Sequence, residues 1–424
     1  MPPVTAGSAV DACLEMIDRR DAGLHAWVYV DRDGARRTAA ALDRETGAER
    51  THRPLHGVPV ALKDILDAEG MVTTSGARSF AHRRPERDAP VVAALRAAGA
   101  VILGKTVTTE FAFADPSVTR NPWNLEHTPG GSSSGSAAAV AAGMAQVALG
   151  SQTIGSTVRP AAYCGVVGFK GTYGRISTEG VTPLSWSLDH VGILSHSVDD
   201  AARVFSVLAG EPGAAPPERS LQPAHPPRLA VPRAWIEAVA SPEVRAHLNE
   251  IISLLSRAGA AVKDVALPAS ASRIDSDGRL VLRVEAAAYH SRWFSEHASD
   301  YGPKIRELVE SGLGVAAIDY IRAHEARYQF RRDISAIFDA HDAVLLPSAP
   351  TPAPPRSEGT TGDPVFCAPW SFAGFPAIAL PSGITSSGLP LSIQLVGPIA
   401  ADVRLLEVAR WCETRLGFAA APRS

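Results

Sequence analysis

The chain has 424 residues, of which 46% are apolar and 20% are charged, and its formal net charge is -3. This composition is typical of a globular protein with a sizeable core, and the near-neutral charge argues against a nucleic-acid binder or a basic membrane-surface protein. The four cysteines lie far apart and show no metal-ligand or disulfide spacing. No apolar run approaches the roughly 20 residues of a membrane span, and the N-terminus lacks a secretory signal pattern. We therefore expect a soluble, cytoplasmic protein.

The first clear helix signal lies at residues 88–98. Asp88 is expected to be its N-cap, Pro90 falls in the first turn, and Gly99 can close its end. Residues 100–103 are apolar and predict a short buried strand directly after it.

The same alternation continues further along the chain. A helix of small residues is predicted at 136–142 and a strand at 147–149. Alternating helices and strands favour an α/β architecture with a largely buried sheet. We expect one large domain over residues 1–424.

Three long segments differ from this pattern. Residues 211–232 are rich in Pro and Ala and predict a surface linker. Residues 240–340 are mostly helical in pattern, which predicts a helical elaboration within the domain. Residues 346–364 predict a long irregular loop, and such loops in compact domains are often functional.

The most unusual segment runs from residue 128 to 170 and holds two Gly/Ser clusters, at 130–136 and 150–157. A flexible linker is a poor explanation, because the residues between the clusters are apolar and a linker would be polar. Glycines let the backbone approach a ligand closely, and consecutive N–H groups in such a turn form an anion-binding concavity. A serine at the end of the turn would then lie beside an oxyanion hole.

Several ordered motifs resemble those of the amidase signature family. They are GVPVALKD at 57–64, the first Gly/Ser cluster, RPAAYCGVVGFKGTYGR at 159–175, SLDHVG at 187–192, GFPA at 374–377 and GLPLSIQLVGP at 388–398. Together they form a far more specific signal than any one of them. The resemblance implies a single large domain in which helices surround a central mixed β-sheet. It also implies hydrolysis of a carboxamide, with no cofactor and no metal.

The resemblance assigns roles to particular residues. The nucleophile falls on Ser156, the bridging serine with a cis peptide bond on Ser132, and the lysine on Lys63. Its remaining assignments are a supporting Ser133 and an oxyanion hole of the N–H groups of Thr153, Ile154, Gly155 and Ser156. We also predict substrate contacts at Gly131 and at Trp186, the latter as a wall of the pocket.

The implied chemistry is physically coherent. A serine hydroxyl is a weak nucleophile and needs a base. Lysine can be that base only when it is neutral, and burial lowers a lysine pKa because the charged form loses its hydration. Lys63 follows the apolar run VPVAL, which is consistent with a buried strand.

The chain departs from the family pattern near the nucleophile. Ile154 stands where the family usually has Gly, and a β-branched residue would be costly there if the position required a positive φ. Gln152 stands where many members have Asp, and Arg159 lies one place later than the usual Arg. Gly171 replaces a usual Pro. We interpret these departures as subfamily features.

Three other signals are set aside. Residues 99–106 match the Walker A string, but an apolar strand in place of the Gly-rich turn cannot wrap phosphate. Asp189 and His190 are neighbours in sequence, and such neighbours rarely point at each other, so a Ser-His-Asp triad is not predicted. Cys164 lies in an apolar run, which predicts a buried and inert thiol.

Four functions remain open at this point. The first is a stand-alone amidase acting on a small or medium carboxamide. The others are the glutaminase component of an amidotransferase, an amide synthase that passes the acyl group to an amine, and a catalytically silent binding protein. The residues TEFAFAD at 109–115, without the insertion usual in such a glutaminase component, argue against the second. We expect the chain to bind a small amide substrate, and to bind neither nucleic acid nor a membrane. A homodimer is one option for its oligomeric state.

Overall fold

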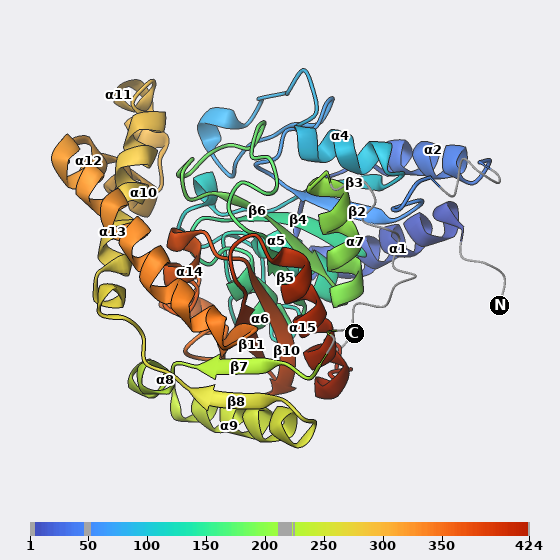
Figure 1. Ribbon diagram of the computed structural model, residues 1–424. Coiled ribbons are helices and arrows are strands. Elements are labelled where there is room, and N and C mark those ends of the chain that lie inside the picture. Colours follow the sequence, from blue (N-terminus) through green and yellow to red (C-terminus); the bar gives the residue numbers. More distant parts are fainter. Residues whose placement is uncertain (1–4, 46–51, 211–222, 224, 423–424) are drawn as a thin grey trace.

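The computed structural model describes residues 5–45, 52–210, 223 and 225–422. Over these residues a mixed sheet of eleven strands is surrounded by helices (Figure 1). The strand order is β1-β3-β2-β4-β6-β5-β10-β11-β9-β7-β8. The strands are β1 Trp27–Val30, β2 Pro59–Lys63, β3 Val101–Thr106, β4 Val147–Gln152, β5 Val167–Lys170, β6 His190–Ser195, β7 Arg228–Val231, β8 Ala261–Asp264, β9 Ala343–Pro347, β10 Ala377–Ile384 and β11 Pro390–Val396.

Three parallel strands near one end of the sheet position the candidate site. β2 pairs in parallel with both β3 and β4, and β4 then pairs antiparallel with β6. Every residue of β2, β3 and β4 is buried, as expected for strands covered on both faces. Because parallel strands end at one edge, the ends of β2 and β4 bring Lys63 and Gln152 to the same edge of the sheet. Ligands of open α/β sheets bind at such an edge.

Helices cover both faces of the sheet. In Figure 1, α7 and α15 lie side by side in front of it, and α5 and α6 lie behind it. The helices of the described residues are α1 Ala6–Leu24, α2 Arg32–Leu42, α4 Pro90–Ala97, α5 Ser134–Ala141, α6 Val158–Cys164, α7 Val198–Leu208, α8 Arg233–Val239, α9 Pro242–Arg257, α10 Ile274–His290, α11 Phe294–His297, α12 Pro303–Leu313, α13 Ala317–Ser335, α14 Ala368–Ala373 and α15 Asp402–Leu416.

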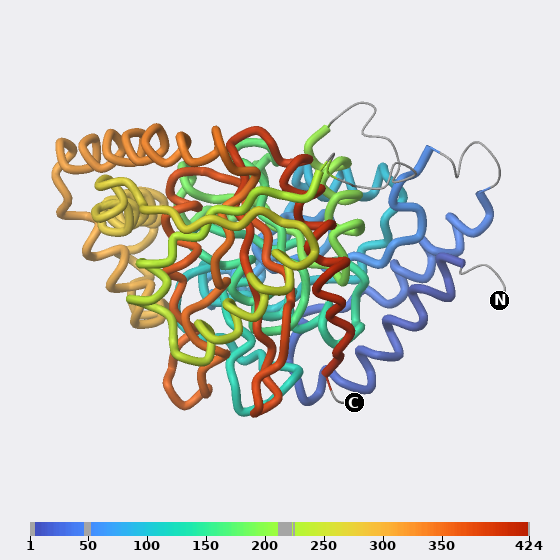
Figure 2. The backbone as a smooth tube through the Cα atoms, turned by 60° about the horizontal axis from the view of Figure 1, so that its bottom comes forward, coloured from blue at the N-terminus to red at the C-terminus, as the bar shows by residue number. Residues whose placement is uncertain are grey.

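The segment predicted to be helical, 240–340, divides into two parts. α10 packs on both α12 and α13, and these helices extend from one end of the molecule (Figures 1 and 2). α9 and β8 instead belong to the far edge of the sheet, where β8 pairs with β7. A strand within this segment was not predicted, since β8 has only four residues and is mostly exposed.

The predicted surface linker at 211–232 is partly wrong. Residues 228–231 form β7, which lies between β9 and β8 in the sheet and is almost entirely buried. Four residues between prolines carry too little periodicity to be recognised as a strand. Residues 211–222 and 224 lie outside the described residues. The irregular loop predicted at 346–364 is confirmed from residue 348 on, with one short helical turn at Arg356–Glu358, whereas residues 346 and 347 end β9.

Predicted boundaries elsewhere are close to the observed ones. The predicted helix 88–98 is α4, but its N-cap is Ala89 and not Asp88. The carboxylate of Asp88 instead accepts the N–H of Glu69 at 2.8 Å and pairs with Arg96 at 2.9 Å. The helix predicted at 136–142 begins two residues earlier, as α5.

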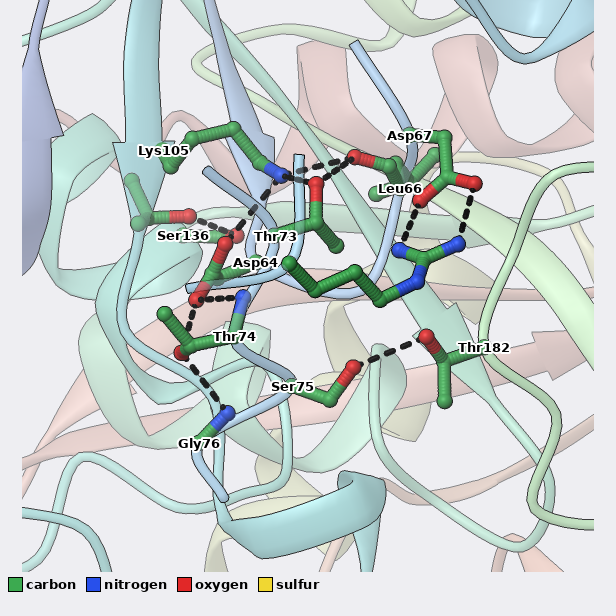
Figure 3. Close-up of polar contacts among 12 residues, drawn as sticks. Asp64, Leu66, Asp67, Thr73, Thr74, Ser75, Gly76, Lys105, Ser136 and Thr182 are labelled. Atoms are coloured by element: carbon green, nitrogen blue, oxygen red, sulfur yellow. Dashed lines mark hydrogen bonds and ion pairs between the residues drawn. The ribbon is translucent and has the colours of Figure 1, made fainter. Parts of the chain in front are cut away.

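The Walker-like string folds as a strand, as its apolar residues predict. β3 continues through Gly104 to Thr106, with Gly104 at a φ of 149° where a side chain would collide with the carbonyl of Tyr29. Lys105 is fully buried and pairs with Asp64 at 3.1 Å. Its Nζ also donates to the Leu66 carbonyl at 2.7 Å (Figure 3). The lysine is therefore committed to a buried ion pair, and not to a phosphate.

We expect Lys105→Met to destabilise the protein by about 3–5 kcal/mol, because it leaves the carboxylate of Asp64 buried without its cation. Urea denaturation measures the loss. Lys263→Met is the matched control, since Lys263 is exposed on β8 and its replacement should change stability by less than about 0.5 kcal/mol. Equal stabilities of the two variants would contradict this account of the ion pair.

Candidate active site

Lys63 ends β2 and is completely buried. Its Nζ donates hydrogen bonds to the hydroxyl oxygens of Ser132 and Ser151, both at 2.7 Å. Burial lowers the pKa of Lys63 to about 7, against an opposing effect of the negative charge of Asp189. A lysine in this state is partly neutral near pH 7 and can accept a proton.

Ser132 lies just before α5, and the Gly131–Ser132 peptide bond is cis. The Ser132 carbonyl accepts the N–H of Thr109 at 3.2 Å, which fixes the backbone beside its hydroxyl. Ser133 holds the neighbouring strand: its hydroxyl donates to the carbonyl of Ser151 at 3.2 Å and accepts the N–H of Ser151 at 3.1 Å. Ser133 therefore aligns Ser151 with Lys63.

Ser156 lies in the loop between β4 and α6. Its carbonyl accepts the N–H of Ser133 at 3.3 Å, which brings the two Gly/Ser clusters together. No described residue forms a hydrogen bond with its side-chain hydroxyl, and the residue retains 9% of its exposure. The hydroxyl is thus not committed to any other group in the described part of the chain.

Four consecutive backbone N–H groups precede and include the nucleophile candidate. Those of residues 153–156 donate to no group among the described residues. Four free donors in one turn suit a developing negative charge. Ile154 is not among the described residues with a positive φ, so the β-branched side chain causes no strain, and it packs against the core. The anticipated cost at this position is absent.

A family model for Amidase matches residues 8–406. The chain belongs to the amidase signature family. A glutamyl-tRNA(Gln) amidotransferase subunit of Roseiflexus sp. (strain RS-1) is 34% identical over 454 aligned positions, covering 96% of this chain and 92% of the relative. A crystal structure of an amidase is 34% identical with a TM-score of 0.89, covering 97% of this chain and 96% of that one. The peptide amidase of Stenotrophomonas maltophilia is 31% identical with a TM-score of 0.84, covering 99% and 95%.

These comparisons confirm the family and the fold class that the sequence predicts. None of the helices in the described part of the chain is long and apolar enough to cross a membrane.

A second departure from the family pattern, Gln152, braces the turn formed by residues 153–156. Its Oε1 accepts the N–H groups of Thr157 and Val158, both at 2.9 Å, at the start of α6. Its Nε2 donates to the hydroxyl of Ser371 on α14 at 2.8 Å. An amide can donate and accept at once, whereas a carboxylate only accepts. Gln152 therefore ties the turn to α14 without burying a charge.

A third departure, Arg159, ties the segment with the cis peptide bond to the 346–364 loop. Its guanidinium donates to the carbonyl of Gly131 at 2.8 Å, to the hydroxyl of Thr361 at 3.0 Å and to the carbonyl of Gly362 at 2.8 Å. Gly131 also packs tightly, since a side chain there would meet Thr361 at 2.8 Å. Gly131 therefore serves close packing beside Ser132.

Sequence reasoning missed Ser151, which contacts Lys63 directly. Ser151 lies within the second Gly/Ser cluster, but its partner depends on the pairing of β4 with β2, which the sequence does not specify. Trp186 stands at the surface with 48% of its area exposed, and its carbonyl accepts the hydroxyl of Tyr173 at 2.9 Å. A substrate contact at Trp186 stays a prediction.

The residues set aside in the sequence have structural partners. His190 Nδ1 hydrogen-bonds the carbonyl of Gln152 at 3.0 Å, and burial holds its pKa well below the usual value. Cys164 is buried, donates to the carbonyl of Pro129 at 3.4 Å, and has a pKa raised by burial. Asp189 contacts other groups than His190 does, as expected for neighbours in sequence.

We expect Gln152→Leu to lower the free energy of unfolding by about 2 kcal/mol or more, because it leaves two buried N–H groups without an acceptor. Labelling of Ser156 by a fluorophosphonate should slow in parallel, since the turn loses its brace. Thermal and urea denaturation give the first quantity, and mass spectrometry gives the second. Gln146→Leu is the control, a half-buried glutamine outside the turn. A Gln152→Leu protein as stable and as reactive as wild type would contradict the bracing role.

Proposed function

We propose that the protein hydrolyses a carboxamide with Ser156 as nucleophile and Ser132 and Lys63 as its proton relay. The observation that carries the proposal is the 2.7 Å hydrogen bond between the buried Lys63 Nζ and the Ser132 hydroxyl. Three further features support it: a pKa of Lys63 lowered to about 7 by burial, four free N–H groups beside Ser156, and membership of the amidase signature family.

The relay proceeds in balanced proton steps. Neutral Lys63 accepts the proton of Ser132, which accepts the proton of Ser156 as its oxygen attacks the amide carbonyl carbon. The N–H groups of residues 153–156 stabilise the resulting oxyanion. The relay then returns a proton to the amide nitrogen, the C–N bond breaks, and the amine leaves an acyl-enzyme on Ser156. Water, deprotonated through the same relay, releases the carboxylic acid.

The substrate class is a small or medium carboxamide in solution. A second candidate is glutamine hydrolysis as part of an assembly, because relatives at 34–36% identity are named as subunits of glutamyl-tRNA(Gln) amidotransferase. The 454 aligned positions exceed the 424 residues of this chain, so the chain lacks residues that the Roseiflexus relative has. Release of ammonia from glutamine, compared with a panel of small carboxamides, separates the two candidates. The ratio of hydroxamate to free acid formed in the presence of hydroxylamine measures how the acyl-enzyme divides between acyl transfer and hydrolysis.

We expect Ser156→Ala to abolish labelling by a fluorophosphonate and all amide turnover, while the thermal midpoint stays unchanged. The hydroxyl is the attacking group, and no described residue depends on it for a hydrogen bond. Peptide mass spectrometry of the wild-type adduct locates the reactive residue. Ser206→Ala on α7 is the control and should be labelled normally. An adduct on another residue would refute the assignment.

We expect Lys63→Met to slow labelling of Ser156 by at least about 100-fold, the usual contribution of a positioned base. In the wild type the rate should rise with pH through about 7, because Lys63 is charged below its pKa and neutral above it. The variant should lose this rise. Lys263→Met, the same substitution at an exposed lysine, serves as the control. A Lys63→Met protein with the wild-type rate and profile would exclude the relay.

A further inference from the structure

The buried carboxylate of Asp189 links the turn at residues 153–156, called the oxyanion turn below, to the neighbouring segment 184–189. Asp189 is 7% exposed. Its Oδ1 accepts the hydroxyl of Thr153, and its Oδ2 accepts the N–H groups of Leu184 and Ser185 at 2.9 and 3.0 Å. Both oxygens are therefore occupied by donors, which is the arrangement that suits an ionised carboxylate. Thr153 carries the first of the four free N–H groups, so Asp189 fixes the start of the oxyanion hole.

The segment that Asp189 holds is itself anchored to the helices of the 240–340 segment. Glu285 on α10 is fully buried, and its Oε2 accepts the hydroxyl of Ser185 at 2.6 Å and the N–H of Ser187 at 3.0 Å. Arg327 on α13 donates to the Ser187 carbonyl at 3.1 Å. A continuous set of hydrogen bonds therefore runs from α10 and α13 through residues 184–189 to the oxyanion turn.

Asp189 also lies near Lys63 without contacting it, because it accepts the hydroxyl of Thr153, two residues after the Ser151 whose hydroxyl accepts from Lys63 Nζ. Among the described residues the direct partners of Lys63 Nζ are two neutral hydroxyls, so its charged form has no contacting counterion. Burial lowers the pKa of Lys63 to about 7, and the charge of Asp189 opposes this by raising it. Burial raises the pKa of Asp189 to about 6, while its hydrogen bond from Thr153 lowers it.

The other titratable groups around Asp189 face elsewhere. Glu285 raises the pKa of Asp189 by repulsion, but is itself held by Ser185, Ser187 and by His324 at 3.7 Å. Burial alone would raise the pKa of Glu285, whereas its hydrogen bonds lower this pKa to about 2, so Glu285 stays ionised near neutral pH. His190 faces the Gln152 carbonyl and the charge of Lys170, and burial keeps it neutral by lowering its pKa.

We propose that Asp189 is a positioning residue of this site, which holds Thr153 of the turn at residues 153–156 in place and supplies a negative charge that acts on Lys63. The proposal rests on the proposed function, since it assigns Lys63 the role of base. It explains how a fully desolvated lysine keeps enough proton affinity to accept a proton near neutral pH. It also gives residues 240–340 a role, because α10 and α13 set the position of the segment that carries Asp189.

The test is the pH dependence of the rate at which a fluorophosphonate labels Ser156. Asp189→Asn is nearly isosteric: its Oδ1 can accept the N–H groups of Leu184 and Ser185 while its amide donates to Thr153. Removal of the negative charge should lower the pKa of Lys63. We therefore expect the rise in rate to move to lower pH by about half a unit or more, since a nearby opposite charge typically shifts a pKa by about one to three units.

A second pair of variants isolates the positioning role. Thr153→Val removes the hydroxyl that Asp189 accepts but leaves the carboxylate charged. We expect a lower plateau rate with the rise at its wild-type pH, and recovery of the plateau in Thr153→Ser. Asp402→Asn is the matched control: Asp402 is an equally buried carboxylate that accepts the N–H and hydroxyl of Thr172, and its replacement should move neither quantity.

The outcomes separate this proposal from the proposed function. Wild-type profiles in both Asp189→Asn and Thr153→Val, with Ser156→Ala unlabelled, would overturn the role of Asp189 and leave the hydrolase intact. Normal labelling of Ser156→Ala would instead overturn the function. If Asp189→Asn fails to fold, an unchanged plateau in Thr153→Val by itself overturns the positioning role.

Discussion

The site depends on the burial of one lysine without a contacting counterion. Lys63 ends a strand that is covered on both faces, and its Nζ reaches only the hydroxyls of Ser132 and Ser151 among the described residues. The cost of dehydrating an ammonium group is large enough to bring the pKa of this lysine to about 7. The two Gly/Ser clusters are then arranged around the neutral amine, one supplying Ser132 and the other supplying Ser151 and Ser156.

Two other buried lysines show that burial alone does not make a base. Lys105, on the neighbouring strand, contacts the carboxylate of Asp64 at 3.1 Å as well as the hydroxyl of Thr73 at 2.7 Å. Lys170 also has a pKa lowered to about 7 by burial, but its Nζ donates to the carbonyls of Phe375 and Gly171, which carry no proton to give. Of these three lysines, Lys63 is the one whose desolvated amine meets two hydroxyl groups, which can donate a proton. What distinguishes Lys63 from the other two lysines is therefore the groups that its amine contacts, and not the loss of hydration on burial.

The sequence predicts what is local and misses what depends on strand pairing. Lys63, Ser132 and Ser156 are assigned through the resemblance to the amidase signature family, because each lies in a short motif that the sequence shows locally. Ser151 and Asp189 are not assigned in this way, because their partners are set by the pairing of β4 with β2 and with β6. β7 fails for a related reason: four residues carry no useful period, and only the neighbouring β9 and β8 make them a strand.

The departure from the family pattern at Gln152 determines which charges are buried near Ser156. A carboxylate at position 152, as many family members have, would place a second buried negative charge next to the oxyanion turn. Gln152 fills that position with a neutral amide that still satisfies Thr157 and Val158 and also reaches Ser371. The charge acting on Lys63 within the described residues is then that of Asp189 alone. The pKa of Lys63 is thus set mainly by burial and opposed by the charge of Asp189, and α10 and α13 hold the segment that carries Asp189 through Glu285 and Arg327.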